Sequence, residues 1–140
     1  MKKMLLILTI LLVGFSAIAF FTAQAAVKDK VIAYYFRGTF RSPSCRHLEK
    51  NCRGVIETSF RDALASGKLE FQVVILGDKG EGYYANYYKI YARTLILSLV
   101  KDGKEIEWKN LDRIGEFFDD REGFSEYLKK EINIFLGKAE

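Results

Sequence analysis

The sequence predicts an α/β fold in which helices flank a central mixed four-stranded sheet, built from a parallel pair plus an antiparallel hairpin. Residues 31–36 form a continuous apolar run, which is typical of a strand buried on both faces. A helix-periodic segment separates this run from a second apolar stretch at 69–76, an order that favours a parallel pair. The dipeptide Asp102-Gly103 lies between two further strand-like segments and is a strong hairpin sequence.

The first 25 residues have the organisation of a targeting segment, so they are left out of the predicted fold. Lys2 and Lys3 precede an apolar run at 5–21, and the small residues of 23–25 precede a cleavage point before Ala26. We therefore expect a signal peptide at 1–25 and an exported protein, periplasmic or otherwise extracytoplasmic. The alternative is an uncleaved segment, in which residues 5–21 anchor the domain at the outer face of the membrane.

The remaining residues, 26–140, are enough for a single domain with a core of its own. The formal charge of the whole chain is +4, and loss of Lys2 and Lys3 with the signal peptide leaves +2. So small an excess gives no support to a nucleic-acid partner, and we expect none. Export would place the two cysteines, Cys45 and Cys52, in a compartment where disulfides persist.

The first helix is predicted to begin at Pro43 and to continue to about residue 66. Proline is favoured at the first helical position because its missing N–H would be unpaired there anyway. Apolar residues recur in steps of three and four, which marks one buried stripe, and Gly67 fits the C-cap. The stripe comprises Cys45, Leu48, Cys52, Val55, Ile56, Phe60, Ala63 and Leu64.

The second half of the chain is predicted to contain a tyrosine-rich helix, the hairpin and two further helices. The tyrosine-rich helix spans 82–91, and the hairpin strands lie at 95–100 and 105–108. Asn110 is placed to cap a short helix to 118, and Asp120 to cap a last helix to about 136. Two readings of the tyrosines stay open, packing against the sheet or a surface for a partner or ligand. They are Tyr83, Tyr84, Tyr87, Tyr88 and Tyr91.

Cys45 is the candidate reactive group because it lies in the first turn of the predicted first helix. A helix N-terminus carries partial positive charge and favours a thiolate. Arg37, Arg41 and Arg46 add three cations nearby, which also favours a lowered pKa for the Cys45 thiol. The alternative is a buried small hydrophobe, since Cys45 also belongs to the apolar stripe.

The stretch Arg41-Ser42-Pro43-Ser44-Cys45 resembles the start of a thioredoxin-like domain, where strand, loop, C-x-x-C and helix follow one another. The resemblance covers about residues 28–138 and implies the thioredoxin fold. The second cysteine of the motif is Cys45, but the family's attacking cysteine is replaced by Ser42. The family's cis-proline falls in the stretch 92–95, where this chain has Arg93 at or beside that position. Arg93 would then be a fourth cation close to Cys45.

The remaining candidates are the second cysteine and the cationic surface. Cys52 lies seven residues after Cys45 in the predicted helix, about 10.5 Å at 1.5 Å per residue, which is too far for a disulfide in a continuous helix. Cys52 is therefore expected to pack in the core, and we expect no metal and no cofactor. The cationic residues either attract an anion or acidic partner, tune Cys45, or form a solvated face. The candidate binding residues are Arg37, Arg41, Ser42, Pro43, Arg46 and Arg93.

Two functional hypotheses follow from this degenerate C-x-x-C motif. One is an exported thioredoxin-like module that is thiol-redox-related or has become a redox-inactive, partner-binding protein. The alternative is a single-cysteine thiol-disulfide oxidoreductase that forms mixed disulfides through Cys45. Whether the protein is an enzyme stays open, and an enzyme would be oxidoreductase-like. The expected partner is a protein or a small thiol, and membrane contact is expected only through an uncleaved N-terminal segment.

Overall fold

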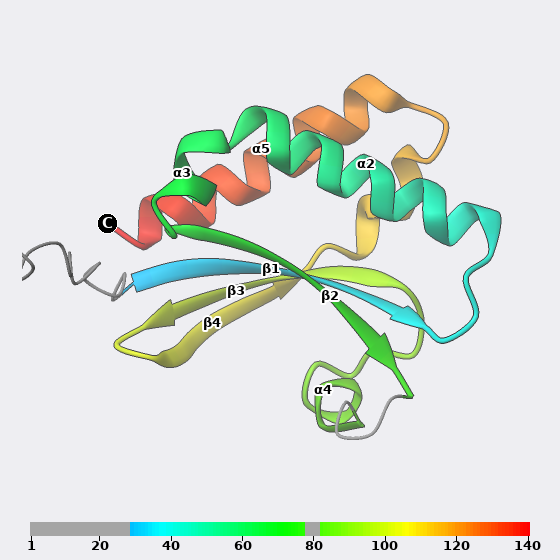
Figure 1. Cartoon of the computed structure of the whole chain (residues 1–140), viewed down its shortest axis with the longest axis horizontal. Coiled ribbons are helices and arrows are strands. Elements are labelled where there is room, and N and C mark those ends of the chain that lie inside the picture. The colour runs from blue at the N-terminus through cyan, green and yellow to red at the C-terminus, as the bar shows by residue number, and fades with distance from the viewer. Residues whose placement is uncertain (1–28, 78–81) are drawn as a thin grey trace, which may run out of the picture.

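The computed structural model describes residues 29–77 and 82–140 (Figure 1). The predicted signal peptide at 1–25 lies outside these residues. None of the helices in the described ranges has the length and apolar character needed to cross a membrane. The elements in chain order are β1 (Asp29–Gly38), α2 (Pro43–Ser59), α3 (Arg61–Ala65), β2 (Leu69–Leu76), α4 (Gly82–Tyr87), β3 (Thr94–Lys101), β4 (Lys104–Asn110), the 3₁₀ helix η1 (Asp112–Phe117) and α5 (Arg121–Lys138).

The strands form one sheet with the order β2-β1-β3-β4. β1 pairs in parallel with β2, so that Val31 lies opposite Leu69. β1 pairs antiparallel with β3, so that Phe36 lies opposite Thr94, and β3 and β4 form the antiparallel hairpin. The predicted mixed four-stranded sheet, with its parallel pair and hairpin, is confirmed.

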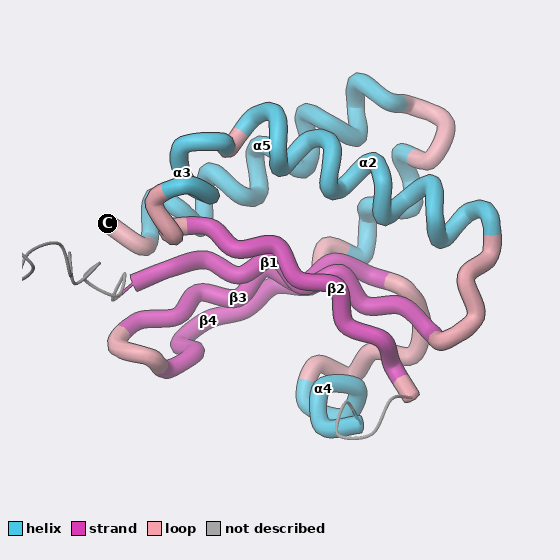
Figure 2. The backbone as a smooth tube through the Cα atoms, in the orientation of Figure 1, coloured by secondary structure: helices cyan, strands magenta, loops and turns pink. Residues whose placement is uncertain are grey.

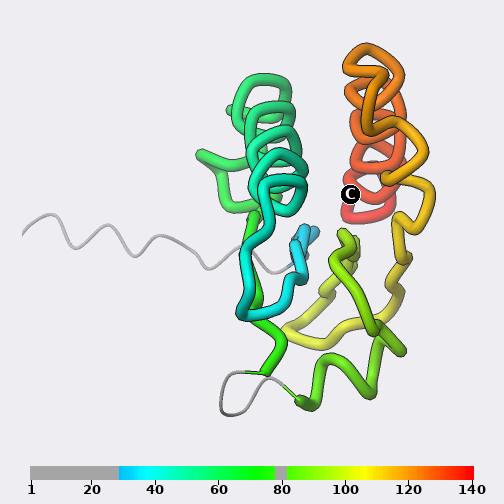
Figure 3. The backbone as a smooth tube through the Cα atoms, turned by 90° about the vertical axis from the view of Figure 1, so that its right-hand side faces the viewer, coloured from blue at the N-terminus to red at the C-terminus, as the bar shows by residue number. Residues whose placement is uncertain are grey.

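The sheet separates two apolar layers of unequal size. Helices α2, α3 and α5 cover one face, and α4 lies against the other near the end of β2 (Figure 1). The view turned by 90° shows α2 and α5 side by side above the sheet (Figure 3). Val31, Ala33 and Tyr35 point into the larger layer, whereas Phe36 packs in the smaller one with Tyr88. Both faces of β1 are therefore covered, which explains its unbroken apolar sequence.

The predicted first helix is interrupted where the sequence showed no break. Phe60 leaves the helical region, with φ −125° and ψ 31°, and separates α2 from α3. Its ring is buried, and its N–H still bonds to the Ile56 carbonyl. Packing of the Phe60 ring thus outweighs continuation of the helix, and Gly67 follows α3 with the positive φ of 77° expected at a helix end.

Two further predictions differ from the structure. The tyrosine-rich helix ends at Tyr87, because Lys89 adopts a left-handed φ of 52° and turns the chain toward β3. Tyr91 is consequently outside the helix and exposed. Asn110 does not cap a helix; it belongs to β4, where its side-chain oxygen accepts a hydrogen bond from the Thr94 hydroxyl at 2.5 Å.

The hairpin has the turn that its sequence predicts and a bulge that it does not. Asp102 and Gly103 both have positive φ, 52° and 75°, as a type I′ turn requires. The pairing then passes from Val100–Glu105 to Leu99–Glu107, which leaves Ile106 as an extra residue. This bulge changes which residues of β4 share a face of the sheet.

The Asp120 cap is a local interaction whose contribution to stability can be measured directly. Its carboxylate accepts a hydrogen bond from the Gly123 N–H at 2.9 Å at the start of α5. We expect Asp120→Ala to lower the free energy of unfolding by about 1 kcal/mol, the usual cost of losing an N-cap. Asp119→Ala, at the adjacent exposed residue, is the control and should leave it unchanged within about 0.5 kcal/mol in denaturant titrations. Equal losses of stability in the two variants would contradict a stabilising role for the Asp120 cap.

Candidate functional site

The candidate site lies where two loops meet at one end of the sheet. Figure 2 shows the loop between β1 and α2 and the loop before β3 at that end. The pairing of Phe36 with Thr94 fixes this arrangement, because β1 ends where β3 begins. Cys45 comes from the first loop and helix, and Arg93 from the second loop. Residues 48 positions apart in the chain are thereby brought into contact.

Ser42 is the N-cap of α2 and holds the backbone of Cys45. Its backbone is extended, and its hydroxyl accepts a hydrogen bond from the Cys45 N–H at 3.2 Å. Pro43 occupies the first turn, as the sequence predicts. The buried Tyr35 donates a hydrogen bond from its hydroxyl to the Cys45 carbonyl at 3.1 Å. Cys45 is thus positioned by both a cap and a core side chain.

Arg93 is the cation that contacts the thiol. Its guanidinium donates a hydrogen bond to the Cys45 sulfur across 3.8 Å. The described residues contain no cis peptide bond, so this loop approaches Cys45 with trans geometry and a cationic side chain. The cavity beside the thiol is lined by Gly38, Cys45, Leu48, Ala92, Arg93, Asp112, Ile114 and Gly115.

The environment of Cys45 favours its thiolate. The Ser42 hydroxyl, as a hydrogen-bond partner of the thiol, contributes most to lowering the pKa of Cys45. The hydrogen bond and the positive charge of Arg93 lower this pKa further, while partial burial opposes them. The N-terminus of a 17-residue helix also favours a negative charge here. Cys45 is partly exposed, so a thiolate would be accessible to other molecules.

Two of the candidate arginines, Arg37 and Arg41, converge with Arg53 of α2 on Glu49 instead of Cys45. The Glu49 carboxylate lies 2.9 Å from Arg41, 3.6 Å from Arg37 and 4.0 Å from Arg53. Arg46 donates to the Arg41 carbonyl at 3.0 Å. Glu49 therefore ties α2 to the end of β1 and to the loop that leads to Cys45. The structure brings together Ser42, Pro43, Cys45 and Arg93, and places Arg37 and Arg41 in this separate cluster.

Cys52 is fully buried, seven residues along the same continuous helix. Burial raises the pKa of the Cys52 thiol to about 12, so it stays protonated at neutral pH. Both cysteines are free thiols. The packing role predicted for Cys52 agrees with its place in the main core.

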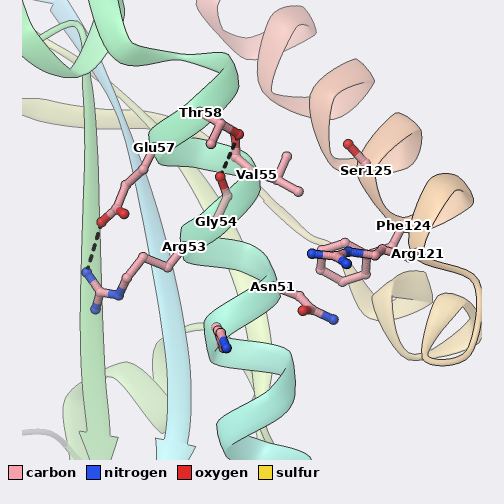
Figure 4. A pocket seen from close by; sticks show the side chains of 10 residues that line it. Asn51, Arg53, Gly54, Val55, Glu57, Thr58, Arg121, Phe124 and Ser125 are labelled. Atoms are coloured by element: carbon pink, nitrogen blue, oxygen red, sulfur yellow. Dashed lines mark hydrogen bonds and ion pairs between the residues drawn. The ribbon is translucent and has the colours of Figure 1, made fainter.

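A second concave region lies between α2 and α5, and it contains none of the predicted site residues (Figure 4). Arg53 and Glu57 form an ion pair on its wall at 3.5 Å. The Thr58 hydroxyl is bonded to the Gly54 carbonyl at 2.7 Å. The described lining residues of this region include no thiol, so we assign the chemistry to the Cys45 end of the sheet.

No protein-family model and no curated protein matches the chain. Among solved structures, a cysteine-to-serine variant of thioredoxin from Entamoeba histolytica is 19% identical, covers 77% of this chain and 89% of its own, and has a TM-score of 0.36. Thioredoxin from Fasciola hepatica is 20% identical, with 71% and 83% covered and a TM-score of 0.33. An oxidized thioredoxin from Arabidopsis thaliana is 14% identical, with 64% and 73% covered and a TM-score of 0.34.

Similarities at this level carry no argument by themselves, and the assignment of the fold rests on topology. The order β2-β1-β3-β4, with only the β1–β2 pair parallel, places the parallel pair beside the hairpin. A helix joins the parallel strands and another follows the hairpin. The fold is thioredoxin-like. In this thioredoxin-like domain Cys45 occupies the first turn of the helix after β1, as the family resemblance implies.

Two exposed aromatic side chains lie in the loops that carry the candidate site. Phe40, in the loop before Ser42, is 82% exposed, and Tyr91, in the loop before Arg93, is 93% exposed. The Ser-Pro pair could have revealed the Ser42 cap from the sequence, because a capping residue followed by proline is a helix-start pattern. No comparable pattern identifies Tyr35 or Arg93 as neighbours of Cys45.

The electrostatic account of Cys45 predicts a graded response to substitution. Ser42→Ala and Arg93→Ala each remove a group that favours the thiolate, so both should raise the pKa of Cys45. The pH midpoint of its alkylation rate should move upward in both variants. Arg46→Ala is the control, because Arg46 bonds to the Arg41 carbonyl, and it should leave the midpoint in place. A downward shift in either test variant would contradict this account.

The Glu49 cluster predicts a stability difference between two glutamates of α2. Glu49→Gln removes a largely buried charge from three arginines, and we expect the free energy of unfolding to fall by about 1–3 kcal/mol. Glu57→Gln breaks one exposed pair with Arg53 and should change it by about 0.5 kcal/mol or less. Urea denaturation of both variants tests this, and equal losses would show that the cluster adds no stability of its own.

Proposed function

We propose that this chain is a thiol-redox-related, thioredoxin-like module that acts through the single thiolate of Cys45. The observation that carries the proposal is the Arg93 guanidinium, 3.8 Å from a partly exposed sulfur at a capped helix N-terminus. A cationic, accessible environment of this kind is typical of reactive cysteines, whereas inert ones lie buried. Cys52 in the same helix shows the inert environment.

The proposed step is a single thiol–disulfide exchange. The Cys45 thiolate attacks one sulfur of a disulfide, either in a partner protein or in the oxidised, disulfide form of a small thiol. A new bond forms between Cys45 and that sulfur, the old disulfide bond breaks, and the second sulfur leaves as a thiolate. No oxidant beyond the attacked disulfide is required. Because Ser42 has no thiol and Cys52 is buried, a thiol from outside the chain must later release the adduct.

We place this exchange outside the cytoplasm, since the predicted signal peptide at 1–25 supports export to a disulfide-permissive compartment. The partner is a protein or a small thiol, without nucleic acid, metal or cofactor. Phe40 and Tyr91 supply exposed aromatic surface on the two loops that carry the site. A protein partner would gain affinity from burying these rings.

A second candidate function, redox-inactive partner binding, is favoured by one observation. The family's nucleophile is replaced by Ser42, whose hydroxyl is already engaged with the Cys45 N–H and with Ser44 at 3.0 Å. Ser42 thus has a structural role that requires no redox chemistry. In this reading Phe40, Tyr91 and Arg93 form the recognition surface, and Cys45 need not react.

The two functions are separated by the reactivity of Cys45 in the folded chain. An aromatic disulfide that releases a coloured thiolate should modify one thiol in the full-length protein at neutral pH and two after unfolding. Cys45→Ser should abolish the first equivalent, and Cys52→Ala should retain it, because only Cys45 is accessible. The rate should follow a pH midpoint below the free-cysteine value of about 8.5.

If neither thiol reacts until the protein unfolds, the exchange reaction is contradicted and redox-inactive binding is left as the function. Mass spectrometry of the adduct identifies the modified residue. The Cys52→Ala variant also checks that the first equivalent does not arise from partial unfolding, since its only thiol is Cys45.

A further inference from the structure

The sheet face opposite α2 and α5 contains a second polar centre, unrelated to Cys45. A pocket opens there between the α4 tyrosines and strands β1, β3 and β4. The carboxylate of Glu105 lies in its wall, and its other charged lining residue is Lys30. Lys30 is neutralised by an ion pair with Glu70 at 2.5 Å. The pocket therefore has one uncompensated negative charge among its described lining residues.

The bulge at Ile106 builds this pocket. Glu105 lies opposite Val100 and Trp108 opposite Ser98, two positions that share one face of β3. In a regular strand, side chains three residues apart point to opposite faces, so the bulge is what brings Glu105 and Trp108 to one face. Glu107 lies opposite Leu99 and is ion-paired with Lys138 of α5 on the helix-covered face. The bulge thus directs one glutamate to each side of the sheet.

The Glu105 carboxylate is held by two hydroxyl groups. One oxygen accepts hydrogen bonds from the Tyr88 hydroxyl, at 2.5 Å, and from the Ser98 hydroxyl. The other oxygen is buried and has no hydrogen-bond partner among the described residues. A buried carboxylate with incomplete hydrogen bonding retains unsatisfied negative potential.

Aromatic rings surround this charge on the solvent side. The rings of Tyr83 and Tyr87 stack with centroids 5.5 Å apart, and Trp108 lies 6.5 Å from Tyr87 and 5.1 Å from Tyr88. Tyr83, Tyr87 and Trp108 are 66%, 43% and 38% exposed, so ring faces are open to a ligand. Ring faces carry partial negative charge and attract cations, most strongly those of Trp and Tyr.

The Glu105 carboxylate changes the pKa of two neighbouring tyrosines. The nearby Glu105 carboxylate, as an acceptor and as a negative charge, raises the pKa of Tyr87. Burial, followed by the hydrogen bond with Glu105 and its negative charge, raises the pKa of Tyr88. The pocket thus combines exposed aromatic faces with an underlying anion, a combination that suits a weakly hydrated organic cation.

We propose that this pocket binds an alkylated ammonium group, with the Tyr83 and Tyr87 rings as its cation–π surface and Glu105 as its counter-charge. The same chemistry is available from a free quaternary amine and from a methylated lysine side chain of another protein. The pocket takes the ammonium group in either case. This site is independent of Cys45 and of the function proposed for it.

The test is a titration of the full-length chain followed by fluorescence of Trp108, its only tryptophan. Choline and a short peptide with one trimethyllysine are the two probes, and dimethylbutanol is the uncharged isostere of choline. We expect a saturable change with at least one cationic probe and affinity at least about tenfold weaker for dimethylbutanol. Tighter binding of the peptide would identify a protein side chain as the source of the ammonium group, and tighter binding of choline a free amine.

Two variants and one control locate the binding. Glu105→Gln keeps an acceptor for Tyr88 and Ser98 but removes the charge, and should weaken binding at least about tenfold. Tyr87→Leu should do the same, at a position that is 43% exposed. Glu107→Gln, two residues along the same strand on the other face, should bind as the parent does. Circular dichroism checks folding, and Tyr87→Leu decides alone if Glu105→Gln does not fold.

The proposal is overturned if neither cationic probe gives a saturable change, or if dimethylbutanol binds as tightly as choline. Full affinity in the folded Glu105→Gln and Tyr87→Leu variants would also overturn it. Each result leaves the thiol chemistry untouched, because Cys45 and its neighbours lie in a different cavity.

Discussion

Burial of β1 on both faces and both edges is the constraint on which the rest of this domain depends. β2 and β3 pair with its two edges, the main core covers one face, and α4 tyrosines cover part of the other. Alternate side chains of one strand therefore serve different sites. Tyr35 reaches the Cys45 carbonyl, Arg37 reaches Glu49, and Tyr34 lines the Glu105 pocket. The Cys45 site and the Glu105 pocket are therefore both positioned by side chains of β1.

The thiol site illustrates how little is needed to create a reactive environment on such a scaffold. A capping hydroxyl, a helix terminus and one guanidinium surround Cys45. Glu49 forms ion pairs with the nearby Arg37 and Arg41. The number of nearby arginines would overstate the electrostatic influence on the sulfur, because Arg37 and Arg41 contact the Glu49 carboxylate instead. Position relative to the thiol decides the effect, and only Arg93 has that position.

Features encoded by local patterns could be predicted from the sequence, and features created by packing could not. The bounds of β2, the Pro43 helix start, the Asp120 cap and the Asp102-Gly103 turn each depend on a few adjacent residues. The break at Phe60 required knowledge of where its ring is buried. The Glu49 cluster joins a strand, a loop and a helix, so residue spacing did not reveal it. The acidity of the tyrosine pocket was missed because strand alternation places Glu105 and Trp108 on opposite faces.

That last point changes what specifies the pocket. The identities of Glu105 and Trp108 are not sufficient, since the bulge at Ile106 is what brings two side chains three residues apart to one side of the sheet. The pocket is therefore encoded by the backbone conformation of β4 as much as by its composition. If Ile106 paired regularly with Leu99 while Glu105 stayed opposite Val100, Trp108 would pass to the helix-covered face. Deleting Ile106 would instead leave Glu105 and Trp108 two residues apart, on one face of a regular strand. Related chains can thus keep this arrangement without Ile106, whereas an unbulged strand of the same length would separate the carboxylate from the indole with every side chain unchanged.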